Sequence, residues 1–274
     1  MAYLVRRHKV SERRACRLVG QHRSTQRYTP IIPEREQQLV KAMNKLAAKR
    51  PRWGYRRVYQ VLRDEGWKVN RKRVERLWRL EGHRVPLRRV KASGQKALGH
   101  DGNSIWMRPA SAANHIWAYD LMSTRTRRGG LVRILNVVDE FTRVALGALV
   151  ANSIGAQHVV AFLEQLFEQH GTPRGIRSDN GREFIAGTVI EWLGERNVEA
   201  IFVEKASPQQ NSFIERFNGT MRDEVLHGEE FDSVLEARVV ITAWLDVYNQ
   251  QRPHRALGMR TPAAFALAQN GVPG

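Results

Sequence analysis

From residue 115 onward the chain follows a pattern of hydrophobic residues that restricts it to few folds. Three segments rich in β-branched residues follow one another across short turns, at 116–123, 131–138 and 144–151, and they predict a meander of strands. Further along, the pattern predicts helices at 156–170, 188–197, 212–226 and 233–248 and short strands at 175–178 and 199–203. A meander followed by strand–helix alternation predicts an α/β fold with a mixed sheet and flanking helices. Several α/β folds share this order of elements.

Three acidic residues of this region are candidates for a common site. Asp120 lies in the middle of the first strand, where a lone carboxylate is costly to bury unless it is paired or bound to a metal. Asp179 follows the strand at 175–178, and sites of open α/β sheets lie at such carboxyl ends. Glu215 lies on the first turn of its helix, beside a predicted buried stripe formed by Ile214, Phe217, Met221 and Val225.

Three carboxylates from a strand, a strand end and a helix fit the oxygen-ligand chemistry of Mg²⁺. Two such ions, with Mn²⁺ as a substitute, would activate an attacking oxygen and stabilise a leaving one at phosphorus. Two of the acids also have an ordinary interpretation: Asp179 as a surface turn before Asn180-Gly181, and Glu215 as an acid favoured at a helix start. Asp139 and Glu140 also end a strand, and we interpret them as turn residues. The histidines at 170, 227 and 254 do not have convincing metal spacing.

The charge of the chain is concentrated before residue 115. Residues 1–114 hold 29 Lys and Arg against 8 Asp and Glu, a net of 29 − 8 = +21, whereas residues 115–274 hold 16 against 19, a net of −3. Such a basic segment favours a polyanionic partner, with DNA or RNA ahead of a membrane surface. The chain is therefore predicted to hold nucleic acid through its first half.

A helix-turn-helix is predicted within residues 30–84. A helix at 34–49 precedes a helix that ends near Glu65, a turn at Gly66, and a helix from Arg71 to Glu81 that is capped by Asn70. Its predicted DNA contacts are Arg56, Arg57, Arg71, Lys72, Arg73 and Arg76. The alternative is a plain helical hairpin with a solvated basic face. A shorter basic helical segment at 1–29 could be half of a second helix-turn-helix or simply a solvated helix.

The remaining organisation follows from composition. Residues 85–114 are basic and then rich in Gly, Ser and Ala, so we expect a linker in which Trp106 docks on the following domain, residues 115–274. Cys16 is the only cysteine, which excludes an intrachain disulfide and favours a reducing compartment. No apolar run approaches the roughly 20 residues that span a bilayer, and no signal peptide is recognisable, so a soluble cytoplasmic protein is expected.

Several motifs together resemble the catalytic core of the retroviral-integrase-like DDE superfamily. The closest resemblance is to OrfB-type transposases of the IS-three group of bacterial insertion sequences. It rests on residues 117–120, 136–143, 178–181, 209–219 and 248–254, on 35 residues between Asp179 and Glu215, and on residues 53–57 and 69–74 upstream. Ser212 and Arg182 depart from the residues common in the family, glycine and proline, beside the site.

The resemblance implies a ribonuclease-H-like fold and a catalytic triad of Asp120, Asp179 and Glu215. It implies transfer of a DNA 3′-hydroxyl onto a phosphodiester, with double-stranded DNA (element ends and target) as substrate and a homo-oligomer assembled on it. Enzymes of this family are often fusions with an upstream OrfA-type part that carries a coiled-coil stretch. No heptad segment of useful length is present here, so the chain either acts alone or needs such an upstream partner. The alternatives are a DNA-binding regulator without enzymatic activity and a nuclease of the same fold.

Overall fold

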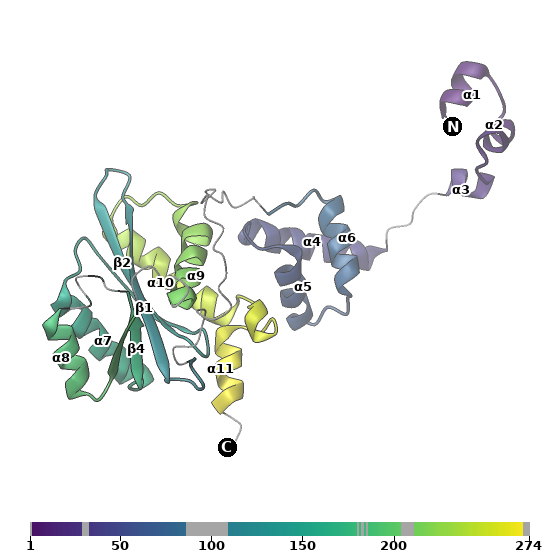
Figure 1. The fold of residues 1–274 in the computed structure, drawn as a ribbon. Coiled ribbons are helices and arrows are strands. Elements are labelled where there is room, and N and C mark those ends of the chain that lie inside the picture. The colour runs from purple at the N-terminus through teal and green to yellow at the C-terminus, as the bar shows by residue number, and fades with distance from the viewer. Residues whose placement is uncertain are drawn as a thin grey trace. The chain divides into compact units, whose positions relative to one another are not determined.

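A computed structural model describes residues 2–28, 33–85, 109–179, 181, 184, 186–203 and 211–270 (Figure 1). The chain divides into two compact units, residues 1–45 and residues 46–274. Most of the expected linker, with Trp106, and residues 204–210 lie outside the described residues. Among the described residues, no helix is both long enough and apolar enough to cross a membrane.

The first unit is built from short helices: α1 (Ala2–His8), α2 (Glu12–Val19), α3 (Arg23–Arg27) and the first part of α4 (Glu34–Lys49). The side chain of Ser11 accepts a hydrogen bond from Arg14 N and caps α2, and Gly20 ends it in the left-handed conformation (φ 69°). Glu12 binds Arg27 at 2.8 Å and Arg23 at 3.4 Å, which ties α2 to α3. The helical segment expected at 1–29 is present as three short helices, α1, α2 and α3.

The second unit begins with a helical region. Its helices are α5 (Tyr55–Asp64) and α6 (Arg71–Leu80), which contact each other across the turn at Gly66 (φ 89°). Asn70 caps α6 by accepting from Arg73 N at 2.8 Å. The residues facing inward are fully or nearly buried: Val58, Leu62, Val74, Leu77 and Trp78. The predicted order of helix, glycine turn and capped basic helix is therefore confirmed.

A five-stranded mixed sheet forms the rest of the second unit. Its strands are β1 (Ile116–Arg125), β2 (Leu131–Asp139), β3 (Ala145–Ala151), β4 (Gly175–Ser178) and β5 (Glu199–Phe202), in the order β3-β2-β1-β4-β5. The first three strands pair antiparallel as a meander, and β1, β4 and β5 pair in parallel. This arrangement confirms the mixed sheet expected from the order of segments.

Helices cover both faces of the sheet (Figure 1). One face packs Trp117, Tyr119 and Leu135 against α7 (Ala156–His170) and α8 (Gly187–Glu195). The opposite face packs Ala118, Met122 and Ile134 against α9 (Ser212–Met221) and α10 (Val234–Gln250). Because both faces are buried, Ile116 to Tyr119 are all buried and β1 does not alternate between core and solvent there.

The carboxyl-terminal elements differ from the expectation in two places. The predicted helix at 212–226 is α9 followed by one π-helical turn at Arg222–Leu226. A 3₁₀ turn at Arg255–Leu257 and a final helix α11 (Pro262–Asn270) follow α10 and were not predicted. Both lie after residues 248–254, in a segment without a sustained hydrophobic period.

Candidate active site

Strand register brings Asp120 and Asp179 to neighbouring positions. In the parallel pair of β1 and β4, Ala118 lies opposite Arg177. Asp120 lies two residues after Ala118 on β1, and Asp179 lies two residues after Arg177, directly after the end of β4. Both acids therefore lie beside the carboxyl end of β4. The Asp179 side chain is exposed there, and its Oδ1 accepts a hydrogen bond from Gly181 N at 3.0 Å. The prediction that Asp179 sits at a strand end is confirmed.

Asp120 is half-buried and held in a fixed orientation. Its Oδ1 accepts from Leu121 N at 2.8 Å, and its Oδ2 accepts from Asn218 Nδ2 at 2.7 Å. Asn218 lies on α9, one helical turn after Glu215. The bond therefore fixes α9, which carries the third acid, against the strand that carries the first.

Electrostatic interaction links the three acids. Burial, the negative charge of Asp179 and, more weakly, that of Glu215 together raise the pKa of Asp120 to about 6. Partial burial of its carboxyl group also raises the pKa of Glu215, although the residue as a whole is exposed. The charges of Asp179 and Glu215 thus both act on Asp120, which favours a cation beside it.

The hydrophobic stripe of α9 determines where Glu215 points. Ile214, Phe217, Met221 and Val225 are at most 3% exposed and pack into the core beneath β1 and β2, as predicted. Glu215 follows directly after the first of these residues and therefore lies at the border of the stripe. The position of Glu215 beside a buried apolar stripe agrees with the prediction.

The three acids have the hard oxygen donors that Mg²⁺ requires. Within the described parts of the chain, however, no three His, Cys, Asp or Glu side chains lie close enough together to hold one ion. The donor chemistry therefore fits a divalent cation, and the side chains would have to approach one another to bind it.

A buried amide pair behind Asp120 was missed by the sequence analysis. Asn218 is 4% exposed and accepts at its Oδ1 from Asn136 Nδ2 at 2.7 Å, while Asn136 on β2 is fully buried. A polar residue three positions after Glu215, on the inward side of an amphipathic helix, was the signal that could have identified Asn218. Its partners lie 98 and 82 residues away in the chain, so no local pattern could supply them.

Asp139 and Glu140 are structural, in agreement with their interpretation as turn residues. Asp139 Oδ1 accepts from the backbone N–H groups of Phe141 and Thr142 and closes the turn after β2. Glu140 is 1% exposed and is bound by Arg177 Nη1 at 2.9 Å. Both carboxylates are engaged in holding the fold.

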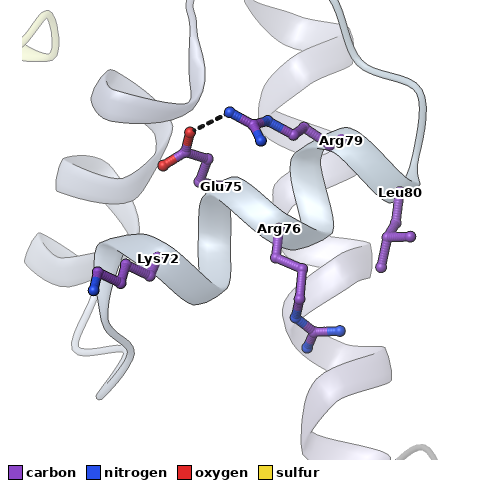
Figure 2. A pocket seen from close by; sticks show the side chains of 5 residues that line it. All are labelled: Lys72, Glu75, Arg76, Arg79 and Leu80. Atoms are coloured by element: carbon purple, nitrogen blue, oxygen red, sulfur yellow. Dashed lines mark hydrogen bonds and ion pairs between the residues drawn. The ribbon is translucent and has the colours of Figure 1, made fainter.

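The exposed face of α6 carries the predicted DNA contacts. Figure 2 shows Lys72, Glu75, Arg76, Arg79 and Leu80, which line a surface pocket on this helix. Glu75 and Arg79 form an i, i+4 ion pair at 2.7 Å, and Arg76 points away from that pair (Figure 2). Arg71, Lys72 and Arg76 are exposed and Arg73 is half-buried. This face therefore presents positive charge at the surface.

Two predicted DNA contacts on α5 have different surroundings. Arg56 is exposed, and its Nε donates to Tyr55 Oη at 3.3 Å. Arg57 is half-buried, and its pKa is lowered to about 10 by burial and by the positive charge of Arg252. Arg57 therefore lies beside another cation, Arg252, and not on the exposed surface that α6 forms.

Comparison with known protein families identifies both parts of the chain. A model described as an HTH-like domain matches residues 34–91. Two models described as integrase core domains match residues 110–208 and 196–262.

Individual proteins agree with these matches. An insertion element IS476 protein of 39.2 kDa from Xanthomonas euvesicatoria is 37% identical over 96% of this chain and 76% of its own length. The transposase InsF for insertion sequence IS3A of Escherichia coli is 25% identical over 78% of this chain and 76% of its own length. Among solved structures, a chain of the simian T-cell lymphotropic virus intasome, in complex with a PP2A regulatory subunit, superimposes with a TM-score of 0.51. It covers 85% of this chain and 77% of its own at 15% identity, which supports the ribonuclease-H-like integrase fold.

Proposed function

Because this chain belongs to the OrfB-type, integrase-core transposases of the IS-three group of insertion sequences, we propose that it catalyses strand transfer through Asp120, Asp179 and Glu215. The reaction is attack of a DNA 3′-hydroxyl on a phosphodiester, after cleavage that frees this hydroxyl. The matches above establish that the chain belongs to the integrase-core family, and what we propose is the identity of its three catalytic residues.

The observation that carries the proposal is the electrostatic coupling at Asp120. Its pKa is raised to about 6 by burial and by the charges of Asp179 and Glu215, so residues from β1, the end of β4 and α9 act on one space. Elsewhere in the described sheet, the buried acids Asp139 and Glu140 have their charges satisfied by hydrogen bonds or by an ion pair. Within the described residues, by contrast, none of the three proposed catalytic acids forms an ion pair.

Divalent ions held by these carboxylates would supply the activation of the attacking oxygen and the stabilisation of the leaving oxygen. Mg²⁺ is the proposed ion, two of them per site, with Mn²⁺ as a substitute. Asp120 is held by Asn218 and Leu121 N, so it offers a fixed ligand, whereas Asp179 and Glu215 are exposed and free to adjust. Asp120 would orient the ions, and the other two would close around them.

The helix-turn-helix is proposed to hold double-stranded DNA. Arg71, Lys72, Arg73 and Arg76 on α6, with Arg56 on α5, would contact the groove and its phosphates. Arg57, half-buried on α5 beside Arg252, would contact a DNA strand from that side instead. Assembly of several copies on the DNA ends, and a contribution from an upstream OrfA-type partner, are part of the same proposal.

A strand-transfer assay on labelled DNA that carries the element's ends tests the catalytic residues. Wild type is compared with Asp120→Asn, Asp179→Asn and Glu215→Gln in Mg²⁺, in Mn²⁺ and in EDTA. Glu168→Gln is the matched control, because Glu168 is exposed on α7, on the opposite face of the sheet. We expect joined products in either metal and none in EDTA. Each triad variant should lose at least about 10²-fold in rate while DNA binding is kept, since a removed charge-stabilising group typically costs this much.

Two outcomes would point to another function. Hydrolysed strands without joined products would identify a nuclease of the same fold. Binding without any metal-dependent product, even after the upstream partner is added, would identify a regulator. Normal turnover of Asp179→Asn or Glu215→Gln would refute the triad.

Salt-dependent binding to duplex DNA tests the helix-turn-helix contacts. The triple substitution of Arg71, Arg73 and Arg76 by Gln is expected to weaken binding and to lower the slope of log K against log salt by about 0.9 for each lost phosphate contact. Arg196→Gln, on α8's C-terminal side and paired with Glu164, is the control. Unchanged affinity and an unchanged slope in the triple variant would exclude these contacts.

A further inference from the structure

A large cationic cavity opens beside Glu215. It has a volume of about 740 Å³, within the range of roughly 300–1,000 Å³ that is typical of pockets for small ligands. Five arginines and one acid are among its lining residues: Arg57, Arg143, Arg216, Arg252, Arg255 and Glu215. Such an excess of positive charge in one cavity favours the binding of an anion.

The carboxylates near these arginines do not neutralise all of them. Arg252 is 6% exposed and is bound by the buried Glu224 at 2.9 Å. Glu140, which is close enough to act on Arg143, is bound by Arg177. Among the described residues, neither Arg57 nor Arg143 forms an ion pair with a carboxylate. Two half-buried guanidinium groups therefore remain without a bound counter-ion.

Arg143 is built into the wall of the cavity. Its backbone adopts φ 65°, and its N–H donates to Asp139 O at 2.9 Å. Its guanidinium lies over the ring of Phe213, 3.6 Å from the centroid, and its Nη1 is buried without a hydrogen-bond partner. A buried donor without a partner is unfavourable, so a ligand oxygen that accepts from this atom would stabilise it.

The cations also repel one another. Burial and the charges of Arg252, Arg57 and Arg143 lower the pKa of His254, another residue lining the cavity, to about 3, so this imidazole is neutral at pH 7. Burial lowers the pKa of Arg143, and the charge of Arg216 adds to that effect. An anion in the cavity would relieve this repulsion.

We infer that this cavity receives one nucleotide of a DNA strand beside the reacting phosphodiester, with its phosphate held by Arg143, Arg255 and Arg57. The inference rests on the proposed strand-transfer function, whose acid Glu215 forms part of the same wall. A nucleotide matches the cavity in charge, and it is a ligand of the size that pockets of this volume hold. The guanidinium–aromatic stack of Arg143 and Phe213 also provides a flat surface of the kind on which bases stack.

Calorimetric titration with thymidine 3′,5′-bisphosphate tests the inference on the full chain, in EDTA and 0.1 M salt. Wild type is expected to bind one equivalent saturably. Arg143→Gln and Arg255→Gln are each expected to weaken binding at least about fivefold, since a charge-assisted hydrogen bond is lost. Arg196→Gln is the matched control, because Arg196 also stacks on an aromatic ring (Trp192, 4.1 Å) but lies outside the cavity. Its affinity should stay within twofold of wild type.

Further comparisons separate the cavity from the helix-turn-helix and from simple anion binding. Lys72→Gln/Arg76→Gln should weaken duplex binding but leave binding of the bisphosphate unchanged. Inorganic pyrophosphate should bind at least tenfold more weakly than the nucleotide. Equal binding of pyrophosphate would overturn the assignment to a nucleotide.

The inference fails if wild type shows no saturable binding, or if both cavity substitutions bind as wild type does. Arg255 is exposed, so Arg255→Gln keeps the test valid if Arg143→Gln unfolds. Because the titration needs neither metal nor joining activity, its result is independent of the strand-transfer assay. A chain that binds the nucleotide but does not join strands would refute only the proposed function.

Discussion

Asn218→Ala is the substitution that tests most directly how the fold holds Asp120. The Asn218 side chain donates to Asp120 Oδ2 and accepts from Asn136 Nδ2, both at 2.7 Å, in a nearly solvent-free position. Truncation removes both bonds at once. Asn136 Nδ2 would then keep only sulfur neighbours, Met122 Sδ at 3.4 Å and Met221 Sδ at 3.7 Å.

The expected loss can be built from the two bonds. A hydrogen bond to a charged group contributes about 1.5–3 kcal/mol, and a buried amide left without a good partner costs about 1–3 kcal/mol. Because Asp120 is only half-buried, water would replace part of the first bond. Asn218→Ala should therefore lower the free energy of unfolding by about 3–4 kcal/mol at pH 8.

The pH dependence identifies the contribution of Asp120. The bond from Asn218 favours the ionised carboxylate and lowers the pKa of Asp120, which is still raised to about 6 overall. An acid with a raised pKa in the folded state is stabilising while protonated, and that stability is lost as the pH rises through about 6. At pH 5 Asp120 is mostly neutral, so the cost of Asn218→Ala should fall to about 1–2 kcal/mol.

Urea denaturation in EDTA, followed by tryptophan fluorescence at pH 5 and pH 8, measures both values. A double-mutant cycle with Asp120→Asn should give a coupling of about 1.5–3 kcal/mol at pH 8 and less at pH 5. Asn152→Ala is the control, because Asn152 is exposed and makes one long bond of 3.4 Å; its cost should stay below about 0.5 kcal/mol. A coupling near zero at pH 8 would show that Asn218 does not position Asp120.

Three further expectations concern the fold around the site. The lowered pKa of His254, about 3, means that the unfolded chain binds the proton first, so this residue should lower the free energy of unfolding by about 1–2 kcal/mol between pH 7.5 and pH 5; wild type should lose that much relative to His254→Gln in urea titrations. Arg177→Met leaves Glu140 buried without its ion-pair partner and should cost about 3–5 kcal/mol, whereas adding Glu140→Gln should recover much of it. Asn249→Ala removes hydrogen bonds of 2.9 and 2.8 Å to the backbone of Ala145 and should lower the free energy of unfolding by about 2–3 kcal/mol, which a lower thermal midpoint would report. An unchanged midpoint would contradict its role in fixing β3 to α10.

Elements with a strong local signal could be predicted from sequence. The helices at Glu34–Lys49 and Ala156–His170 and the strand at Gly175–Ser178 have the predicted bounds, because hydrophobic periodicity and flanking glycines or prolines mark them. The Asn70 cap and the Gly66 turn are also local features. The helix α11 was missed because its apolar residues, mostly alanine, give little contrast between faces.

The surroundings of the candidate site could not be predicted in the same way. The Asn136–Asn218–Asp120 chain joins residues from two strands and a helix, and the cavity collects arginines from α5, the turn after β2, α9 and the segment after α10. Each of these side chains looks like an ordinary polar surface residue in its own segment. Only tertiary packing makes Asn218 buried and leaves Arg143 Nη1 without a partner.

The helix α9 connects the two proposed parts of the site. Its apolar stripe fixes the rotation of the helix, because Ile214 and Phe217 are locked in the core. With that rotation fixed, the neighbouring side chains have fixed directions: Asn218 reaches inward to Asp120, while Glu215 and Arg216 line the cavity. Hydrophobic packing thus specifies where the charges lie. The acid that would hold a cation and the arginines that would hold a phosphate therefore form one continuous surface, and a DNA strand bound to one would be placed against the other.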